Sequence, residues 1–221
     1  MLKIATALFV FLGGFSVMVL EMIGVLYLAK DFGSSFYVWT SQIGVILMAL
    51  ALGYAVGGRL ADHFRRTNFL TAPLALAGLF TILIPQITPR LIHAITDRHP
   101  KGVDISQFWL KVDPALGSAV VFFLPCFVLA LLSPYMIRIC ARQLENVGAI
   151  SGLIYASSTV GSIAGVFISG YILIDRYTVS TIFKSTGVVI LLLAALSLAM
   201  DFWLGARCAP KETGAGDKAV P

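Results

Sequence analysis

Charged residues are scarce in this chain of 221 residues. Lys, Arg, Asp and Glu make up 12% of it, whereas about 25% is usual in a soluble domain. Hydrophobic residues make up 58%, and the mean hydropathy is +0.91. This composition excludes an ordinary soluble enzyme and indicates an integral membrane protein.

Metal-binding residue types are also scarce, with three cysteines and three histidines. The cysteines are far apart: Cys126, Cys140 and Cys208. Without C-x-x-C spacing they predict neither a zinc site nor a disulfide framework. The histidines lie at or beyond the ends of the apolar runs, where none can bind a haem at the membrane centre: His63, His93 and His99. We therefore expect no cofactor, no metal and no catalytic residue.

Apolar runs of roughly 20 residues, the length that crosses a bilayer as a helix, occupy most of the chain. They fall near 4–28, 36–58, 69–88, 114–137, 149–173 and 181–204. The sequence thus predicts an all-α integral membrane domain of six transmembrane helices over residues 1–204. An outer loop is expected at about 89–113. Residues 205–221 are small and polar, which predicts a disordered cytoplasmic tail.

The positions of Lys and Arg predict the orientation. With the N-terminus inside, nine basic residues lie in inner segments: Lys3, Arg59, Arg65, Arg66, Arg138, Arg142, Arg207, Lys211 and Lys218. The two short outer loops hold three: Lys30, Arg176 and Lys184. We expect a multi-pass protein of the bacterial inner (plasma) membrane with both termini cytoplasmic. The net charge of +5 then reflects topology, and nucleic acid is not an expected partner.

Two pairs of similar segments indicate an internal repeat. "FLGGF" from Phe11 resembles "FLPCF" from Phe123, and "GVILMALALGY" from Gly44 resembles "GSIAGVFISGY" from Gly161. The pairs occur in the same order, 112 and 117 residues apart. This predicts a 3+3 repeat whose two copies are inserted in opposite orientations, because each copy has an odd number of spans.

Small residues recur at four-residue spacing in the second and fifth spans, which permits close helix contact: Gly53, Gly57, Gly161 and Gly165. A second, more polar stripe follows in the fifth span: Ser158, Ser162 and Ser169. The simplest interpretation is helix packing. The alternative is that one stripe lines a substrate cavity, or that these helices slide against partners during alternating access.

One carboxylate lies inside the apolar part of the chain. Glu21 is about seven residues from the outer end of the first span. Inserting an acidic residue costs roughly 2.5 to 3.5 kcal/mol at the centre of a membrane helix, and somewhat less at this off-centre position. Gln42 lies at a similar depth in the second span, and Tyr27 is near the outer mouth. We expect Glu21 to be the principal group that binds a cation, with Gln42 and Tyr27 as weaker candidates. The alternative is a hydrogen-bonded carboxyl that only ties helices together.

The segment "GGRLADHFRR" follows the second span. It resembles the cytoplasmic loop motif of the major facilitator superfamily, Gly-x-Leu-Ala-Asp-x-x-Gly-Arg, through Gly58, Asp62 and Arg66. Arg65 stands where that motif has a second glycine. The resemblance implies that this loop takes part in gating, with Asp62 in a contact that opens between two states. The alternative is an ordinary basic loop with a charge pair.

A wider resemblance covers nearly the whole chain. "GFSVMVLEMIG", "FGSSFYVW", "ALGYAVGGRLAD", "LLSPYM" and "GLIYASSTVGSIAGVFISGYILID" occur in this order. They resemble the membrane region of fused major-facilitator/spermidine-synthase proteins, in which a soluble aminopropyltransferase-like domain follows. No such domain follows residue 205 here, so the chain by itself is not expected to be an enzyme.

We expect a half-size secondary transporter that works as a homodimer by alternating access, and the resemblance implies a small organic cation or polyamine-like substrate. The fold expected from the resemblance is one half of a major facilitator. An alternative is a membrane anchor or subunit for a separately encoded soluble enzyme, and a third hypothesis is a structural or assembly factor. The lipid bilayer is the remaining expected partner.

Overall fold

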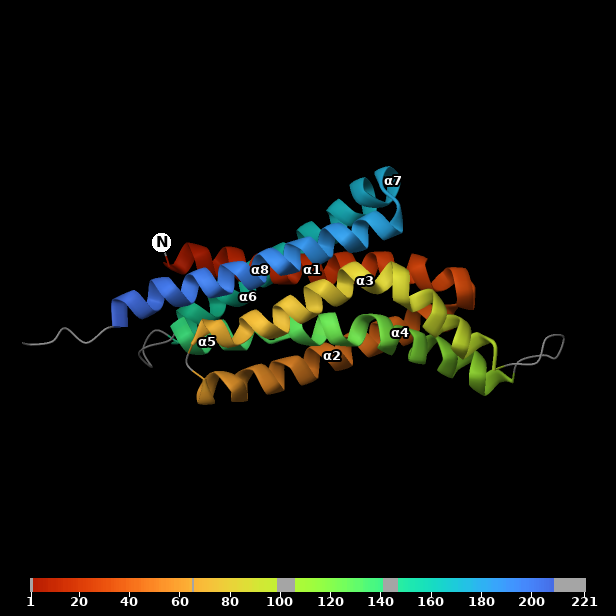
Figure 1. The fold of residues 1–221 in the computed structure, drawn as a ribbon, viewed down its shortest axis with the longest axis horizontal. Coiled ribbons are helices and arrows are strands. Elements are labelled where there is room, and N and C mark those ends of the chain that lie inside the picture. The colour runs from red at the N-terminus through yellow and green to blue at the C-terminus, as the bar shows by residue number, and fades with distance from the viewer. Residues whose placement is uncertain (1, 65, 99–105, 141–146, 209–221) are drawn as a thin grey trace, which may run out of the picture.

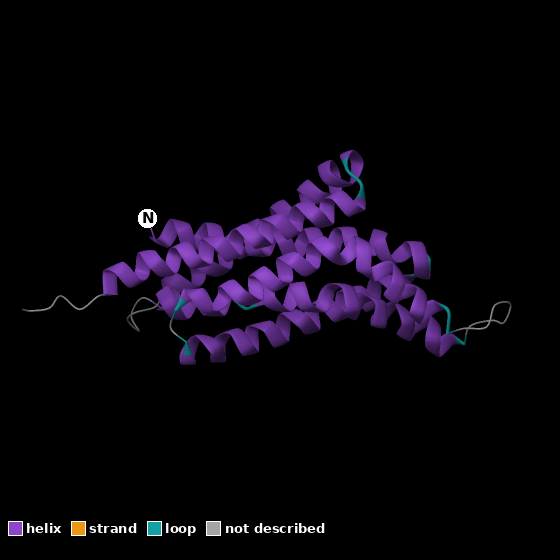
Figure 2. Ribbon diagram, in the orientation of Figure 1, coloured by secondary structure: helices purple, strands orange, loops and turns teal. Residues whose placement is uncertain are grey.

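The computed structural model describes residues 2–64, 66–98, 106–140 and 147–208, and within them it contains helices joined by short connections (Figure 2). The helices run side by side along the long axis of the molecule (Figure 1). In chain order they are α1 (Leu2–Phe32), α2 (Phe36–His63), η1 (Thr67–Leu70), α3 (Thr71–Thr96), α4 (Gln107–Ala130), α5 (Leu132–Cys140), α6 (Val147–Ile168), η3 (Ser169–Leu173), α7 (Ile174–Arg176) and α8 (Val179–Cys208).

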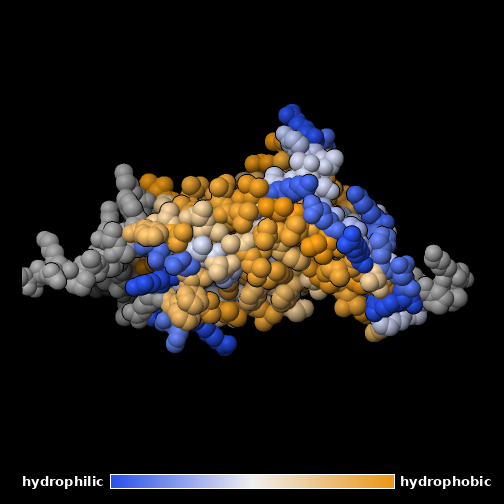
Figure 3. Space-filling model, in the orientation of Figure 1, coloured by the Kyte–Doolittle hydropathy of each residue, from blue (hydrophilic) through white to orange (hydrophobic). Residues whose placement is uncertain are grey.

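Within the described residues, six helical stretches are long and apolar enough to cross a membrane, which confirms the predicted number of spans. They are Ile4–Phe32, Phe36–His63, Thr67–Thr96, Gln107–Cys140, Val147–Arg176 and Val179–Phe202. The surface shows a broad hydrophobic middle with hydrophilic side chains gathered toward the two ends (Figure 3). The chain therefore has the architecture of a multi-pass membrane protein.

The connection between the third and fourth spans is shorter than the outer loop expected at about 89–113. α3 continues to Thr96, through Pro85 and Pro89, and α4 already begins at Gln107. A proline removes only one backbone donor, and a membrane helix packed among neighbours tolerates this loss. At the other end α8 continues to Cys208, beyond the expected start of the tail at 205, and residues 209–221 lie outside the described part.

Two spans depart from regular α-helix near one end. The fourth is broken between α4 and α5, where Leu131 N donates to Val128 O at 3.2 Å. Pro134 has no N–H for the carbonyl of Ala130, which is why the helix breaks at this point. The fifth span passes into a π-helix, η3, where Ser169 Oγ donates to Gly165 O at 2.5 Å.

Three pairs of spans form the most extensive contacts among the described residues: α1 with α6, α2 with the fourth span (α4 and α5), and α3 with α8. A glycine lies at each crossing. A Cβ atom at Gly53 would lie 2.5 Å from the carbonyl oxygen of Phe127, and one at Gly187 would lie 2.8 Å from that of Gly78. Gly161 faces the carbonyl of Phe11 with even less room. The absence of side chains lets these backbones touch.

Candidate functional site

A cavity of about 290 Å³ lies between α1, α2, α6 and the break that joins α4 to α5. Its lining combines apolar side chains, two glycines and six hydroxyl-bearing residues. The hydroxyl-bearing residues are Tyr54, Ser133, Tyr155, Ser158, Thr159 and Ser162. The described lining contains no Lys, Arg, Asp or Glu. This is a site of mixed polarity within a membrane domain, where polar groups need hydrogen-bond partners.

The positions of the lining residues follow from the helix crossings. Gly14 leaves α1 without a side chain where α6 passes, and Ser162 Oγ donates to the Gly14 carbonyl at 3.3 Å. Tyr54 on α2 and Tyr155 on α6 are both exposed and close enough to interact electrostatically. Ser133 lies on α5, just past the break in the fourth span. The two tyrosines thus flank the cavity from its two side helices.

Glu21 lies next to this cavity along α1. Val17 and Met18 line the cavity, and Glu21 is one helical turn further on the same face. Its side chain is half-buried, and it lies close enough to the buried thiol of Cys126 on α4 to interact electrostatically. Within the described part of the chain the Glu21 carboxylate has no hydrogen bond and no ion pair.

Gln42 lies beside Glu21, but it contacts the backbone of that residue. The Gln42 side chain is fully buried, and its Nε2 donates to the Glu21 carbonyl oxygen at 2.7 Å. Its Oε1 has no partner among the described residues. The structure therefore brings these two predicted residues together, with Gln42 tying α2 to α1 directly behind the carboxylate.

Tyr27 is not part of this arrangement. Six positions along an α-helix place it about 120° around α1 from Glu21. Its ring packs edge-on against Phe183 of α8, with centroids 5.2 Å apart, and its hydroxyl lies near the side chain of Thr88. Tyr27 thus belongs to the α1–α3–α8 core, on a different face from the cavity.

The loop expected to take part in gating contains an ion pair. Asp62 Oδ1 lies 2.6 Å from Nε of Arg138 on α5, and both side chains are half or more exposed. Gly58 borders open space, and Arg66 is exposed. Arg65 lies outside the described residues. The pair links the end of α2 to α5 through an exposed contact, and such a contact contributes little free energy.

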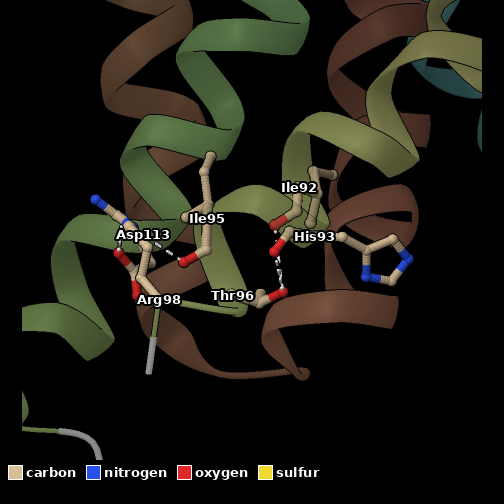
Figure 4. Close-up of polar contacts among 6 residues, drawn as sticks. All are labelled: Ile92, His93, Ile95, Thr96, Arg98 and Asp113. Carbon is tan, nitrogen blue, oxygen red and sulfur yellow. Dashed lines mark hydrogen bonds and ion pairs between the residues drawn. The ribbon is translucent and has the colours of Figure 1, made fainter. Parts of the chain in front are cut away.

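A second ion pair, at the opposite end of the molecule, was not predicted from the sequence. Asp113 Oδ1 on α4 lies 2.9 Å from Nη2 of Arg98, which follows α3 (Figure 4). Arg98 also donates from Nε to Ile95 O at 3.1 Å and lies 5.2 Å from the ring centroid of Trp109. The only signal in the sequence is an acidic residue just inside the start of an apolar run.

The described residues contain no group of three or more His, Cys, Asp or Glu placed to hold a metal ion. Comparison of the chain with protein families, with curated proteins and with solved structures finds no match. The resemblance to the fused major-facilitator/spermidine-synthase proteins thus remains an expectation from the sequence segments, and the candidate site stands on its geometry.

Proposed function

We propose that this chain is a half-size secondary transporter for small organic cations. The observation that carries the proposal is the hydroxyl-lined cavity between α1, α2 and α6, with the carboxylate of Glu21, which has no partner among the described residues, one helical turn beyond its lining on α1. A carboxylate at this depth has a function in substrate or proton pathways more often than in packing. A cation and a proton would compete for it, which gives a simple basis for exchange.

The cavity favours a substrate with one ammonium group and a short apolar part. The described lining holds hydroxyls and apolar side chains and no charged residue, so the one carboxylate available to a ligand is that of Glu21, one helical turn beyond Val17 and Met18 on α1. The rings of Tyr54 and Tyr155 add two surfaces that attract cations. A polyamine with several charges would leave all but one of them without a carboxylate, so a monoamine fits this site better.

The packing of the helices supports the proposed 3+3 repeat. In such a repeat, spans one, two and three correspond to spans four, five and six. The contact between spans one and five (α1 and α6) then corresponds to the contact between spans four and two (α4 and α5 with α2). The contact between spans three and six (α3 and α8) corresponds to itself. Gly53 faces the Phe127 carbonyl and Gly165 faces the Phe15 carbonyl. Gly165 lies 112 positions after Gly53, and Phe127 lies 112 positions after Phe15. The "FLGGF" and "FLPCF" segments have the same spacing.

A homodimer would close the cavity. The small-residue faces of α2 and α6 are occupied within the chain, by Phe127 and Leu131 against one helix and by Phe11 and Phe15 against the other. We therefore propose that two copies contact each other through the face that carries the cavity, beside Tyr54 and Tyr155. Native mass spectrometry in detergent should give two chains. A monomer that still transports would refute this part of the proposal.

Alternating access would use the irregular parts of the fourth and fifth spans. The break between α4 and α5 and the π-helix η3 lie in the helices that flank the cavity, and π-segments often occur at functional sites. The exposed Asp62–Arg138 pair links α2 to α5, so a movement at the break would open it. We place the Asp62 end in the cytoplasm, with both termini inside and the protein in the plasma membrane. Labelling of the tail from outside would contradict that orientation.

Ligand binding to the purified protein tests the proposal. Small monoamines should raise the thermal unfolding temperature of the parent protein, and Glu21→Gln should weaken that binding at least tenfold, about 1.4 kcal/mol. Asp31→Asn is the matched control, because it neutralises an exposed carboxylate at the end of the same helix. If no amine binds the parent, or if both variants bind equally, the assignment of Glu21 fails. Retention of a soluble enzyme by a parent that binds no amine would instead support an anchoring role.

A further inference from the structure

A second cavity lies at the turn between α2 and η1, at the end of the molecule where the second span meets the third. It has a volume of about 590 Å³ and is lined by His63, Phe64, Arg66, Asn68 and Phe69. It is open to the outside and it is separate from the cavity beside Glu21. Its lining combines a guanidinium, an imidazole and an amide with two phenyl rings.

The backbone of this turn is held from behind, by side chains that do not line the cavity. The hydroxyl oxygen of Tyr135 lies 2.5 Å from Phe64 O and 2.7 Å from Arg66 O. Ser197 Oγ donates to Thr67 O at 2.6 Å. Because these contacts reach main-chain oxygens, they hold the backbone at Phe64, Arg66 and Thr67 and leave the lining side chains available to a ligand.

The charge of the cavity is basic. Arg66 is exposed and makes no ion pair among the described residues. Neither neighbouring carboxylate lines the cavity: Asp62 pairs with Arg138, and Asp201 accepts a hydrogen bond from Thr67. A positively charged cavity with amide and imidazole donors suits a phosphate group.

The phenyl rings indicate that the phosphate group belongs to a lipid. Phe64 and Phe69 stack with their centroids 3.7 Å apart, and Phe69 is 44% exposed. The turn joins two membrane spans, so these rings lie at the boundary between the apolar and polar parts of a bilayer. Aromatic side chains favour that boundary, and basic cavities between membrane helices bind anionic lipid headgroups.

We propose that this cavity binds the phosphate group of an anionic phospholipid, with Arg66 and Asn68 at the phosphate and Phe69 against the glycerol and acyl region. The site is independent of the proposed transport function. A bound lipid would bridge the end of α2 and η1, at the end of the molecule where the Asp62–Arg138 pair also lies.

Native mass spectrometry of the delipidated protein in detergent tests this proposal. Phosphatidylglycerol should be retained more strongly than phosphatidylcholine with the same acyl chains. Arg66→Gln should lower phosphatidylglycerol retention about fivefold, the effect of about 1 kcal/mol expected for one basic side chain at a membrane surface. Its backbone bond to Tyr135 is unaffected by the substitution, so the thermal unfolding temperature should not change.

Arg90→Gln is the matched control, because Arg90 is an exposed arginine on α3 that does not line the cavity. It should leave retention unchanged. Equal losses in the two variants would show that the attraction is diffuse and would overturn the site. Equal retention of the two lipids would overturn it as well. Inorganic phosphate should not displace the lipid, and displacement would reassign the cavity to a free phosphate compound.

Discussion

The two faces of α1 are packed in opposite ways. Toward α6, Gly161 meets the Phe11 carbonyl with no room for a single added methyl group. Toward the cavity, Glu21 is half-buried and its carboxylate has no partner among the described residues. A backbone contact of the first kind permits one arrangement of the helices. On the second face the Glu21 carboxylate is available to form an ion pair or hydrogen bonds with a ligand.

The two ion pairs differ in a similar way. The side chain of Asp113 is 7% exposed where it meets Arg98, whereas that of Asp62 is 65% exposed where it meets Arg138. Separating the first pair would leave a charge in a place that water hardly reaches. Separating the second would release both groups into solvent. The Asp113 end is therefore the more permanent one, and the Asp62 end is the one that can open.

The largest effect is expected at the tight face of α1. Gly161→Leu should destabilise the protein by about 3 kcal/mol or more, because the new side chain must displace the backbone of α1. Gly44→Leu is the control, since a Cβ atom at Gly44 meets nothing within 4 Å. Thermal unfolding in detergent measures both. Similar unfolding temperatures for the two variants would contradict the packing described for α1 and α6.

The buried ion pair should give the next largest effect. Asp113→Asn is expected to lower stability by about 2 kcal/mol. This is less than the 3 to 5 kcal/mol typical of a fully buried pair, because the Arg98 side chain is 44% exposed. Unfolding of the variant in a denaturing detergent series measures the loss. A loss of stability smaller than that caused by Asp62→Asn would show that the Arg98–Asp113 pair contributes little to stability.

The exposed ion pair should contribute little to stability. Asp62→Asn is expected to lower it by about 0 to 1 kcal/mol, the usual range for a pair in contact with solvent. The same substitution should increase labelling of a single cysteine introduced at Ser133, because the contact between α2 and α5 is weakened. Unchanged labelling would argue that the pair does not control access to the cavity from this end.

The smallest effect on stability is expected at the cavity face. Glu21→Gln keeps the shape of the side chain and removes a charge that no described residue pairs with, so the unfolding free energy should change by less than about 0.5 kcal/mol. A loss above about 1 kcal/mol would mean that the carboxylate ties helices together. In that case the alternative interpretation of Glu21 would hold.

Much of the fold could be predicted from hydrophobicity alone. The six spans follow from apolar runs that only a membrane helix can bury, and the four-residue spacing of Gly53, Gly57, Gly161 and Gly165 marks faces that touch other helices. The partner of each face could not be predicted, because small-residue spacing does not say which helix approaches. The length of α3 was missed because Pro85 and Pro89 resemble helix ends in a soluble context.

The candidate site was predicted in part. Glu21 and Gln42 were found from their polarity at depth, and the structure brings them together. Tyr27 was grouped with them by depth alone, while its direction around α1 depends on helical phase. The hydroxyls of Tyr54 and Tyr155 could not be predicted because they lie on two separate apolar helices, and only the packing of α2 and α6 around α1 brings them to one cavity. The serine stripe at Ser158 and Ser162 was the signal that pointed there.

Uptake by reconstituted protein tests the central claim most directly. Proteoliposomes containing the parent chain and preloaded with a small unlabelled monoamine should accumulate the labelled amine by exchange, faster than liposomes without protein. Glu21→Gln proteoliposomes with the same protein content should lose this exchange, while Asp31→Asn proteoliposomes keep it. Exchange of the amine at the parent rate by the Glu21→Gln protein, or no exchange by the parent for any small organic cation, would contradict the account.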